Sequence, residues 1–251
     1  MSKAKITPLG TVSPYGKGER NCPGFMVEYK GHRVLLDCGN GITRLMNMPE
    51  CLNNLHVIIT HYHKDHFGDL GALQYASYVY HNLGKLKQPV KVYLPNGDFA
   101  NNESAVVSNT ESFVKYSFIV DGSSFAIEDL TISFADNHSH TIESYMVKLQ
   151  CRDFKMVYTS DIGNTNFDHA VAFCKDSDLI ICESSFLRKH NANSQTHLTA
   201  YDAGLLAKRS SAKRLLLTHF WPEEDRALYV EEAQQVFADT SAAEEGVALI
   251  Y

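Results

Sequence analysis

The stretch "IITHYHKDHFGDLGAL" (residues 58–73) places three histidines and an aspartate within six consecutive residues, directly after an apolar run. The apolar, β-branched segment "HVIIT" (56–60) predicts a short buried strand, and "FGDLGALQYASYVYHNL" (67–83) predicts a helix. The polar cluster therefore lies on a loop that leaves the C-terminal end of a strand. Because α/β proteins usually place their chemistry there, the stretch predicts an α/β protein whose site includes this loop.

The four polar residues of this loop are suitable metal ligands. His61, His63 and His66 offer neutral ring nitrogens and Asp65 a hard oxygen, a set suited to zinc and its neighbours. Side chains alternate in an extended segment, so His61 and His63 point the same way and can bind one ion together. Asp65 and His66, where the chain turns into the helix, can bind a second ion. The alternative is a histidine-rich surface loop, but the H-x-H-x-D-H spacing directly after a buried strand favours the metal site.

Composition indicates a soluble globular protein. The chain has 251 residues, 44% hydrophobic and 21% charged, enough for a substantial core in one domain. No window approaches the ~18 apolar residues of a membrane span, and the N-terminus lacks the pattern of a signal peptide. Six scattered cysteines form no CxxC pair, which predicts free thiols in a reducing cytoplasm.

The charge balance bears on the substrate. Net charge is −6, and no block of the sequence is rich in lysine or arginine. A general phosphate-backbone binder would show a basic face, so this class is disfavoured. A single phosphate ester remains compatible with the charge, since bound metal ions would dominate the local field.

Strand and helix patterns continue along the whole chain. The first part has strand patterns over 25–29 and 32–37, a helical stretch, the strand 56–60, the helix 67–83 and a strand over 90–94. The middle (113–159) is strand-rich, with patterns over 114–120, 130–136, 144–150 and 155–160. The last third alternates three helices (166–175, 200–209, 226–237) with three strands (178–183, 214–220, 247–251). Such runs predict two sheets packed face to face with helices outside, a four-layered αββα sandwich in a single domain, residues 1–251.

The hexamer His61–His66 resembles the signature of the metallo-β-lactamase superfamily, and the resemblance runs over almost the whole chain. That family needs a further histidine, a bridging aspartate and a last histidine, each at a strand end. "FADNHSHTIESYMVKL" offers His140, because "HTIESY" resembles the family's histidine followed five positions on by an aromatic; His138 is the alternative. "MVYTSDIG" offers Asp161, and "RLLLTHFWP" offers His219.

The resemblance implies a binuclear metal centre. One ion would be held by His61, His63 and His140, the other by Asp65, His66 and His219, with Asp161 bridging. Zinc is expected, with manganese and iron as alternatives. Two such ions ~3.5–4 Å apart lower the pKa of a shared water and so supply hydroxide at neutral pH. Asp65 would orient this hydroxide as a catalytic residue.

Two further residues indicate which branch of the metallo-β-lactamase superfamily the chain resembles. Glu183 in "ICESSF" and His197 in "THLTAYDAGLLA" resemble the paired glutamate and histidine of the ribonuclease Z-like phosphodiesterases. The resemblance implies that His197, held by Glu183, donates a proton to the leaving oxygen. Taken singly, Glu183 could be a loop carboxylate and His197 a helix-start residue.

The N-terminal part of the chain resembles the same branch. Residues 10–41 match its opening segment, with Asp37 near the buried base of the site. Contact of Arg20 and Asn21 with a substrate phosphate is a hypothesis. Trp221 either lines the pocket or packs in the core.

One departure concerns the substrate. Ribonuclease Z carries a long Gly/Pro-rich arm for gripping tRNA, between the positions of His140 and Asp161. Only twenty residues separate them here, enough for a strand, a turn and a strand. We therefore expect a small phosphodiester or a short nucleic acid as substrate, rather than precursor tRNA, and no membrane partner.

Other functions and assemblies stay open. One is a hydrolase of a thioester, lactone or lactam, because the fold serves many substrates. Another is a metal-stabilised binding module without turnover. A flavodiiron-type redox protein is disfavoured, since that branch has a carboxylate at the position of His63. The Glu183–His197 pair favours the phosphodiesterase, and both a monomer and a homodimer are compatible with the sequence.

Overall fold

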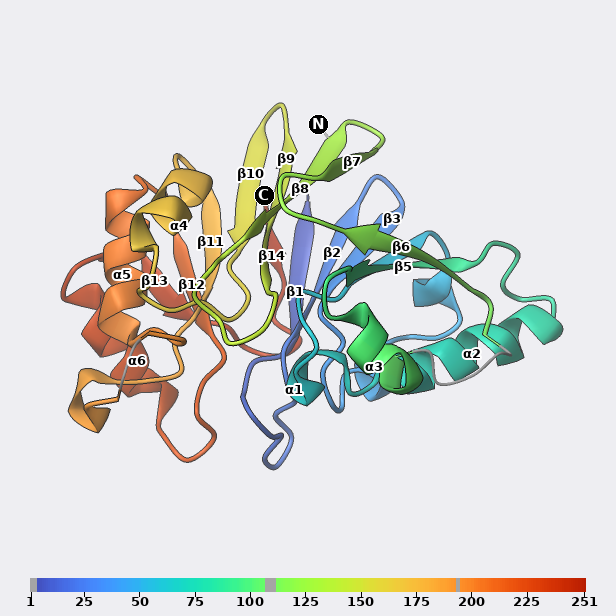
Figure 1. The fold of residues 1–251 in the computed structure, drawn as a ribbon, viewed down its shortest axis with the longest axis horizontal. Helices are drawn as coiled ribbons and strands as arrows, with labels where there is room; N and C mark the ends of the chain where they lie inside the picture. Colours follow the sequence, from blue (N-terminus) through green and yellow to red (C-terminus); the bar gives the residue numbers. More distant parts are fainter. Residues whose placement is uncertain (1–3, 107–111, 193–194) are drawn as a thin grey trace. The chain divides into compact units, whose positions relative to one another are not determined.

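The computed structural model describes residues 4–106, 112–192 and 195–251. The chain divides into two compact units. Unit 1 comprises Met1–Thr11, Tyr15–Ile119 and Glu244–Tyr251, and unit 2 comprises Val12–Pro14 and Val120–Ala243. Each unit contains one seven-stranded mixed sheet with its own helices (Figure 1).

The sheet of unit 1 has the strand order β14-β1-β2-β3-β4-β5-β6. Its strands are β14 (Leu249–Ile250), β1 (Lys5–Gly10), β2 (Gly24–Tyr29), β3 (His32–Leu36), β4 (Leu55–Ile58), β5 (Val90–Pro95) and β6 (Val114–Ile119). The first four are antiparallel neighbours, whereas β3, β4, β5 and β6 run parallel. Strand β4 is buried along its whole length, as its apolar sequence predicts.

The helix expected over 67–83 is α2 (Leu70–Asn82), which begins three residues later than predicted. A separate short helix, α1 (Lys64–Phe67), precedes it. The remaining elements are α3 (Phe99–Val106) and the 3-10 turns η1 (Thr43–Leu45) and η2 (Glu50–Leu52). Asp69, the residue before α2, accepts hydrogen bonds at Oδ2 from Thr43 N (2.9 Å) and Thr43 Oγ1 (2.7 Å).

The sheet of unit 2 has the order β13-β12-β11-β10-β9-β8-β7. Its strands are β13 (Thr240–Ala242), β12 (Leu215–Thr218), β11 (Leu179–Glu183), β10 (Phe154–Tyr158), β9 (Tyr145–Cys151), β8 (Leu130–Asp136) and β7 (Ser124–Ile127). Strands β10 to β13 are parallel, and β7 to β10 are antiparallel neighbours. The β9–β10 hairpin is the strand, turn and strand predicted between His140 and Asp161.

The helices of unit 2 are α4 (Phe167–Cys174), α5 (Ala200–Arg209), α6 (Arg226–Gln234) and the 3-10 turn η3 (Arg188–His190). Helix α5 contacts α4, α6 and strands β11 and β12 (Figure 1). A Cβ at Gly204 would lie 2.7 Å from the carbonyl oxygen of Ala233, so glycine there lets α5 approach α6 closely. The core combines sheet residues such as Ile180 and Leu217 with helix residues such as Leu206.

The predicted functional residues follow the C-terminal ends of parallel strands in both units. Asp37 comes after β3 and the histidine loop after β4; Asp161 follows β10, and His219 follows β12. The α/β class is confirmed. Strands β1, β7 and β13 and helix α3 were not predicted. No helix among the described residues is long and apolar enough to cross a membrane.

Candidate metal centre

Unit 1 gathers the four ligands predicted on the loop after β4. The rings of His61 and His63 have centroids 4.8 Å apart, and those of His61 and His66 are 4.1 Å apart. Asp65 Oδ2 lies 3.5 Å from His66 Nε2. His61, Asp65 and His66 are buried, so imidazoles and a carboxylate are concentrated on one short loop away from bulk water.

Asp37 orients two of these imidazoles. Its Oδ2 accepts a hydrogen bond from His66 Nδ1 at 2.7 Å, and its Oδ1 accepts from Thr60 N at 2.8 Å. Thr60 Oγ1 donates to Asp37 at 3.0 Å and lies 3.1 Å from His61 Nδ1, from which it accepts. Because both Nδ1 atoms carry the proton, Nε2 of His61 and of His66 is the ligand atom in the neutral ring.

Unit 2 gathers the other predicted residues around Asp161. His219 Nε2 lies 3.0 Å from Asp161 Oδ1, and His140 Nε2 lies 4.0 Å from Asp161 Oδ2. The alternative ligand His138 has a half-exposed side chain 3.2 Å from Asp136. The structure therefore places His140 beside Asp161, and Asn137 Nδ2 ties this loop to the carbonyl of Asp161 at 2.6 Å.

Glu183 accepts hydrogen bonds from several groups around the site. Its Oε1 accepts from His197 Nδ1 at 3.0 Å, and its Oε2 accepts from Ser185 Oγ at 2.9 Å. Ser185 Oγ in turn accepts from His219 Nδ1 at 2.8 Å. The Leu198 amide also donates to Glu183 Oε1 at 3.2 Å. Glu183 is 1% exposed, so all these bonds form in a desolvated environment that strengthens them.

The two units thus use the same hydrogen-bonding scheme. A buried carboxylate at a strand end (Asp37 or Glu183) holds one imidazole directly and a second one through a hydroxyl (Thr60 or Ser185). Asp37 and His219 also share a left-handed backbone, with φ of 60° and 62°. Such conformations are uncommon outside glycine and concentrate at functional sites.

The chemistry of this donor set fits a cation. With Nδ1 of His219 donating to Ser185, a neutral His219 presents Nε2 as an acceptor, 3.0 Å from the acceptor oxygen of Asp161. Two acceptors so close repel unless a proton or a cation lies between them. Asp161, His197 and His219 each offer a ligand atom within 4.8 Å of the others. Imidazole with carboxylate suits zinc and related divalent ions.

Two opposing effects act on the pKa of His197. Burial alone lowers the pKa of its imidazole, but the neighbouring carboxylates of Glu183 and Asp161 together outweigh burial and raise it above the usual value. The ring stacks on His219 with centroids 5.5 Å apart. His197 does not start helix α5: Thr199 does, since its Oγ1 accepts from Asp202 N at 3.1 Å in a capping box.

Sequence reasoning missed the two hydroxyl residues and Asn137. Thr60 and Ser185 adjoin recognised residues, but no spacing rule marks them as partners of the histidines. The hypothesis for Asn21 finds no support, because this side chain is buried, donating to the Leu9 carbonyl at 2.8 Å and accepting from Arg44 Nη2 at 3.1 Å.

Cysteine chemistry is not part of this site. All six cysteines are free thiols. Burial raises the pKa of Cys22 to about 11 and that of Cys174 to about 12. Thiols with such a pKa are protonated at neutral pH and are poor nucleophiles.

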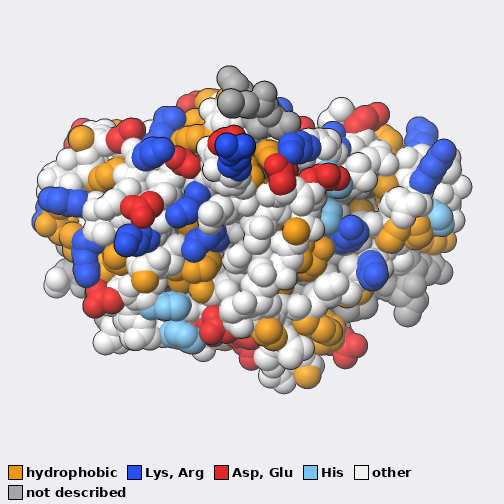
Figure 2. Space-filling view, turned by 90° about the horizontal axis from the view of Figure 1, so that it is seen from above, with side chains coloured by type: hydrophobic (Ala, Val, Ile, Leu, Met, Phe, Trp, Pro, Cys, Tyr) orange, Lys and Arg blue, Asp and Glu red, His pale blue; other side chains and the backbone are white. Residues whose placement is uncertain are grey.

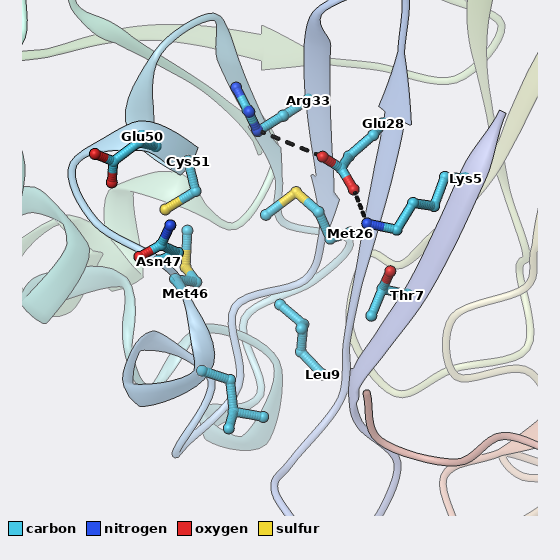
Figure 3. Close-up of a pocket in the computed structure, with 11 residues that line it drawn as sticks. Lys5, Thr7, Leu9, Met26, Glu28, Arg33, Met46, Asn47, Glu50 and Cys51 are labelled. Carbon is cyan, nitrogen blue, oxygen red and sulfur yellow. Dashed lines mark hydrogen bonds and ion pairs between the residues drawn. The ribbon is translucent and has the colours of Figure 1, made fainter. Parts of the chain in front are cut away.

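Two cavities differ in whether predicted site residues line them. A cavity of about 280 Å³ in unit 2 opens onto two predicted residues and is lined by Ser13, Pro14, Ser185, Phe186, His197, His219 and Trp221. A cavity of about 260 Å³ in unit 1 contains none of the predicted residues (Figure 3). Its Glu28 is paired with Lys5 at 2.7 Å and lies 3.9 Å from Arg33. The unit 2 cavity is therefore the candidate substrate pocket, and Trp221 lines it.

Comparison with known proteins identifies the family. The Beta-lactamase superfamily domain matches residues 32–220, three quarters of the chain. The chain belongs to the metallo-β-lactamase superfamily. "Probable metallo-hydrolase YhfI" of Bacillus subtilis (strain 168) is 26% identical over 216 residues, 86% of each chain. The crystal structure of YhfI matches 99% of this chain and 100% of that one, with 25% identity and a TM-score of 0.89.

Relatives of this superfamily member also include ribonuclease Z. The enzyme of Archaeoglobus fulgidus is 29% identical, over 98% of this chain and 97% of its own. That alignment spans 303 positions against a chain of 251 residues, so at least 52 positions are occupied only in the relative. The crystal structure of human tRNase Z, short form, matches 98% of both chains, with 25% identity and a TM-score of 0.75.

These matches confirm the predicted fold class, the metallo-β-lactamase sandwich. Membership of the superfamily supports a metal-dependent hydrolase, and the histidine–aspartate clusters fit divalent metal ions.

Proposed function

We propose that this protein is a binuclear metal-dependent phosphodiesterase. His61, His63 and His140 would hold one divalent ion, Asp65, His66 and His219 the other, with Asp161 shared. Family membership and the orientation of the imidazoles within each unit support this assignment. When bound, the two ions, zinc in our proposal, would lower the pKa of a water molecule and offset charge on a phosphoryl oxygen. Asp65 would accept a hydrogen bond from that water and orient it.

The observation that carries the proposal is the Glu183–His197 pair. The bond from His197 Nδ1 to Glu183 Oε1 (3.0 Å) fixes the ring and leaves Nε2 to hold or transfer a proton. His197 lines the unit 2 cavity, with a side chain 24% exposed, so a ligand can reach it. A histidine so held can protonate a leaving alkoxide, which contributes typically 10²–10⁴-fold to rate.

Two structural roles account less well for His197. Thr199 and Asp202 already cap α5, so the helix start does not need the imidazole. The His197 nitrogen that lies 4.0 Å from Asp161 Oδ2 is Nδ1. That nitrogen is bonded to Glu183, and therefore a proton-transfer role agrees best with the contacts.

The substrate in this proposal is a small phosphodiester or a short nucleic acid. The short β9–β10 hairpin stands where ribonuclease Z carries its arm, which favours this class over precursor tRNA. A thioester, lactone or lactam hydrolase is the alternative, because the fold alone does not select the substrate. The six free thiols favour a reducing compartment, and we propose the cytoplasm.

Leaving-group dependence tests this function. His197→Ala is expected to lower kcat by about 10²–10⁴-fold for a dinucleotide, whose leaving alkoxide needs a proton. For bis(4-nitrophenyl) phosphate, whose leaving group departs readily, kcat should fall far less. Both steady-state rates should be measured on protein whose metal content has been determined.

Metal analysis serves as the internal control. Wild type and His197→Ala should both hold close to two ions per chain. Loss of metal in the variant would make His197 a ligand and contradict the assignment. Equal activity of wild type and variant on both substrates would remove the general-acid role, and turnover of thioesters in place of phosphodiesters would favour the alternative function.

A further inference from the structure

The walls of the unit 2 cavity are aromatic beside the catalytic pair. Phe186 and Trp221 both line it, together with Pro14. The Phe186 ring is 6.1 Å from that of His197, nearly perpendicular at 85°. Trp221 is 39% exposed, an unusual state for the largest apolar side chain, and a ligand in the cavity would cover it.

The backbone of Phe186 is held in place by the surrounding structure. The Phe186 amide donates to the Leu198 carbonyl at 3.1 Å, and its carbonyl accepts from Ala200 N at 2.8 Å. These bonds fasten Phe186 to the segment that carries His197. A cavity wall built on such fixed backbone keeps its shape when a ligand binds, which lowers the entropy cost of binding.

The ring of His190 contacts both aromatic rings. Its ring contacts Trp221 edge-on with centroids 5.5 Å apart, and it contacts Phe186 at 6.4 Å. His190 Nδ1 accepts from Leu187 N at 3.1 Å, and Nε2 donates to Glu224 Oε1 at 3.0 Å. With both nitrogens engaged, the imidazole is a fixed spacer.

The two cationic residues that follow Phe186 and Leu187 in the chain are paired with acidic side chains. Lys189 Nζ lies 2.9 Å from Glu224, and Arg188 Nε lies 3.9 Å from Glu232 while its guanidinium covers the Tyr201 ring. Cations held in this way are poorly placed to grip a polynucleotide backbone. The cavity, about 280 Å³, is at the small end of ligand pockets and suits one ring system.

We propose that this cavity binds a planar aromatic group on the leaving side of the substrate, stacked against Trp221 and Phe186. The substrate would then be a phosphodiester that releases an aryl alcohol or a nucleoside. Both an aryl group and a nucleobase can stack on these walls, because each presents a π face. That the bound molecule is a phosphodiester rests on the proposed function; that the cavity takes a flat ring rests on its walls.

Trp221 is the single tryptophan of the chain, so its fluorescence reports directly on the cavity. We would titrate zinc-loaded protein with adenosine monophosphate, phenyl phosphate and methyl phosphate, which differ in the attached group. Saturable quenching is expected with one or both aromatic esters and not with methyl phosphate. Adenosine monophosphate alone would indicate a nucleobase, phenyl phosphate alone an aryl ester.

Substitutions sharpen the test. Phe186→Ala should lower the affinity for the ester that quenches the fluorescence by about 5- to 100-fold, the range expected for loss of one stacking face. Tyr75→Ala, which removes an exposed aromatic of α2 outside the cavity, is the matched control and should not change binding. Trp221→Ala should raise KM for a dinucleotide over a similar range with metal content intact, and Trp221→Phe should raise it less.

Absence of quenching by every aromatic ester, or equal quenching by methyl phosphate, would overturn the subsite. Phosphodiester turnover without quenching would leave the proposed function standing and remove this inference. Quenching without any phosphodiester turnover would support the aromatic subsite and contradict the proposed function.

Discussion

At the scale of single residues, Ser185 connects His219, a proposed metal ligand, to the Glu183–His197 pair. It accepts from His219 Nδ1 at 2.8 Å and donates to Glu183 Oε2 at 2.9 Å. Ser185→Ala removes both bonds and frees the His219 ring to rotate. We expect metal affinity to fall about 10- to 100-fold, the usual cost of losing a partner of a ligating histidine. Competition with a chelator would measure it.

Two further variants give this prediction its controls. Ser185→Thr keeps the hydroxyl and should retain most of the affinity. Ser184→Ala removes a neighbouring buried hydroxyl that donates to the Thr218 carbonyl at 3.1 Å, without touching a histidine. Metal loss in Ser184→Ala as large as in Ser185→Ala would show a general packing defect.

At the scale of elements, the β4–β5 pair contains a buried, neutral histidine. His56 is 4% exposed, its ring stacks on Tyr93 with centroids 5.9 Å apart, and its Nδ1 lies 3.2 Å from the Tyr93 hydroxyl. Burial is the main cause that lowers the pKa of His56 to about 4, and the positive charges of Lys91 and His32 contribute to the same shift. The imidazole therefore stays uncharged in the folded sheet at neutral pH.

This burial predicts a pH-dependent stability. Between pH 6.5 and 4 the unfolded chain binds a proton at His56 more readily than the folded one, so acid favours unfolding. Relative to His56→Phe, wild type should lose about 2 kcal/mol of unfolding free energy between pH 7 and pH 5. Urea denaturation at both pH values would measure this. As a control, His169→Gln replaces an exposed histidine of α4 and should lose as much unfolding free energy between the two pH values as wild type. An equally large loss in His56→Phe would contradict the prediction.

At the scale of the whole molecule, the short β9–β10 hairpin and the charge of −6 argue against gripping a tRNA. On the face shown in Figure 2, Lys and Arg side chains lie among Asp and Glu side chains. Opposite charges so mixed give little attraction for a polyanion. We expect kcat/KM for precursor tRNA to be far below that of ribonuclease Z measured in parallel, while a small phosphodiester is turned over.

Salt dependence distinguishes the outcomes of that assay. A small substrate held at one site should show a shallow dependence of KM on salt, whereas backbone contacts give a steep one. Efficient cleavage of precursor tRNA that falls steeply with salt would show that another surface grips the RNA, and would contradict the prediction.

The sequence by itself determined the types of residue at the site and their places at strand ends. Short apolar runs mark the buried strands, and polar residues that follow such strands lie at the sheet edge, so His61, Asp161 and His219 could be named as candidates without coordinates. The family and the missing arm followed from spacing along the chain, which is a property of the sequence.

Only the tertiary structure decided which side chains touch. Ser185 bonds His219 from 34 residues away, and Thr43 bonds Asp69, the residue before α2, from 26 residues away. Whether Trp221 lines a cavity or packs in a core was equally open. Such contacts depend on how distant strands and loops meet, and no local periodicity encodes that. The candidate ligands could therefore be named from the sequence, whereas the residues that bond to and orient them could not.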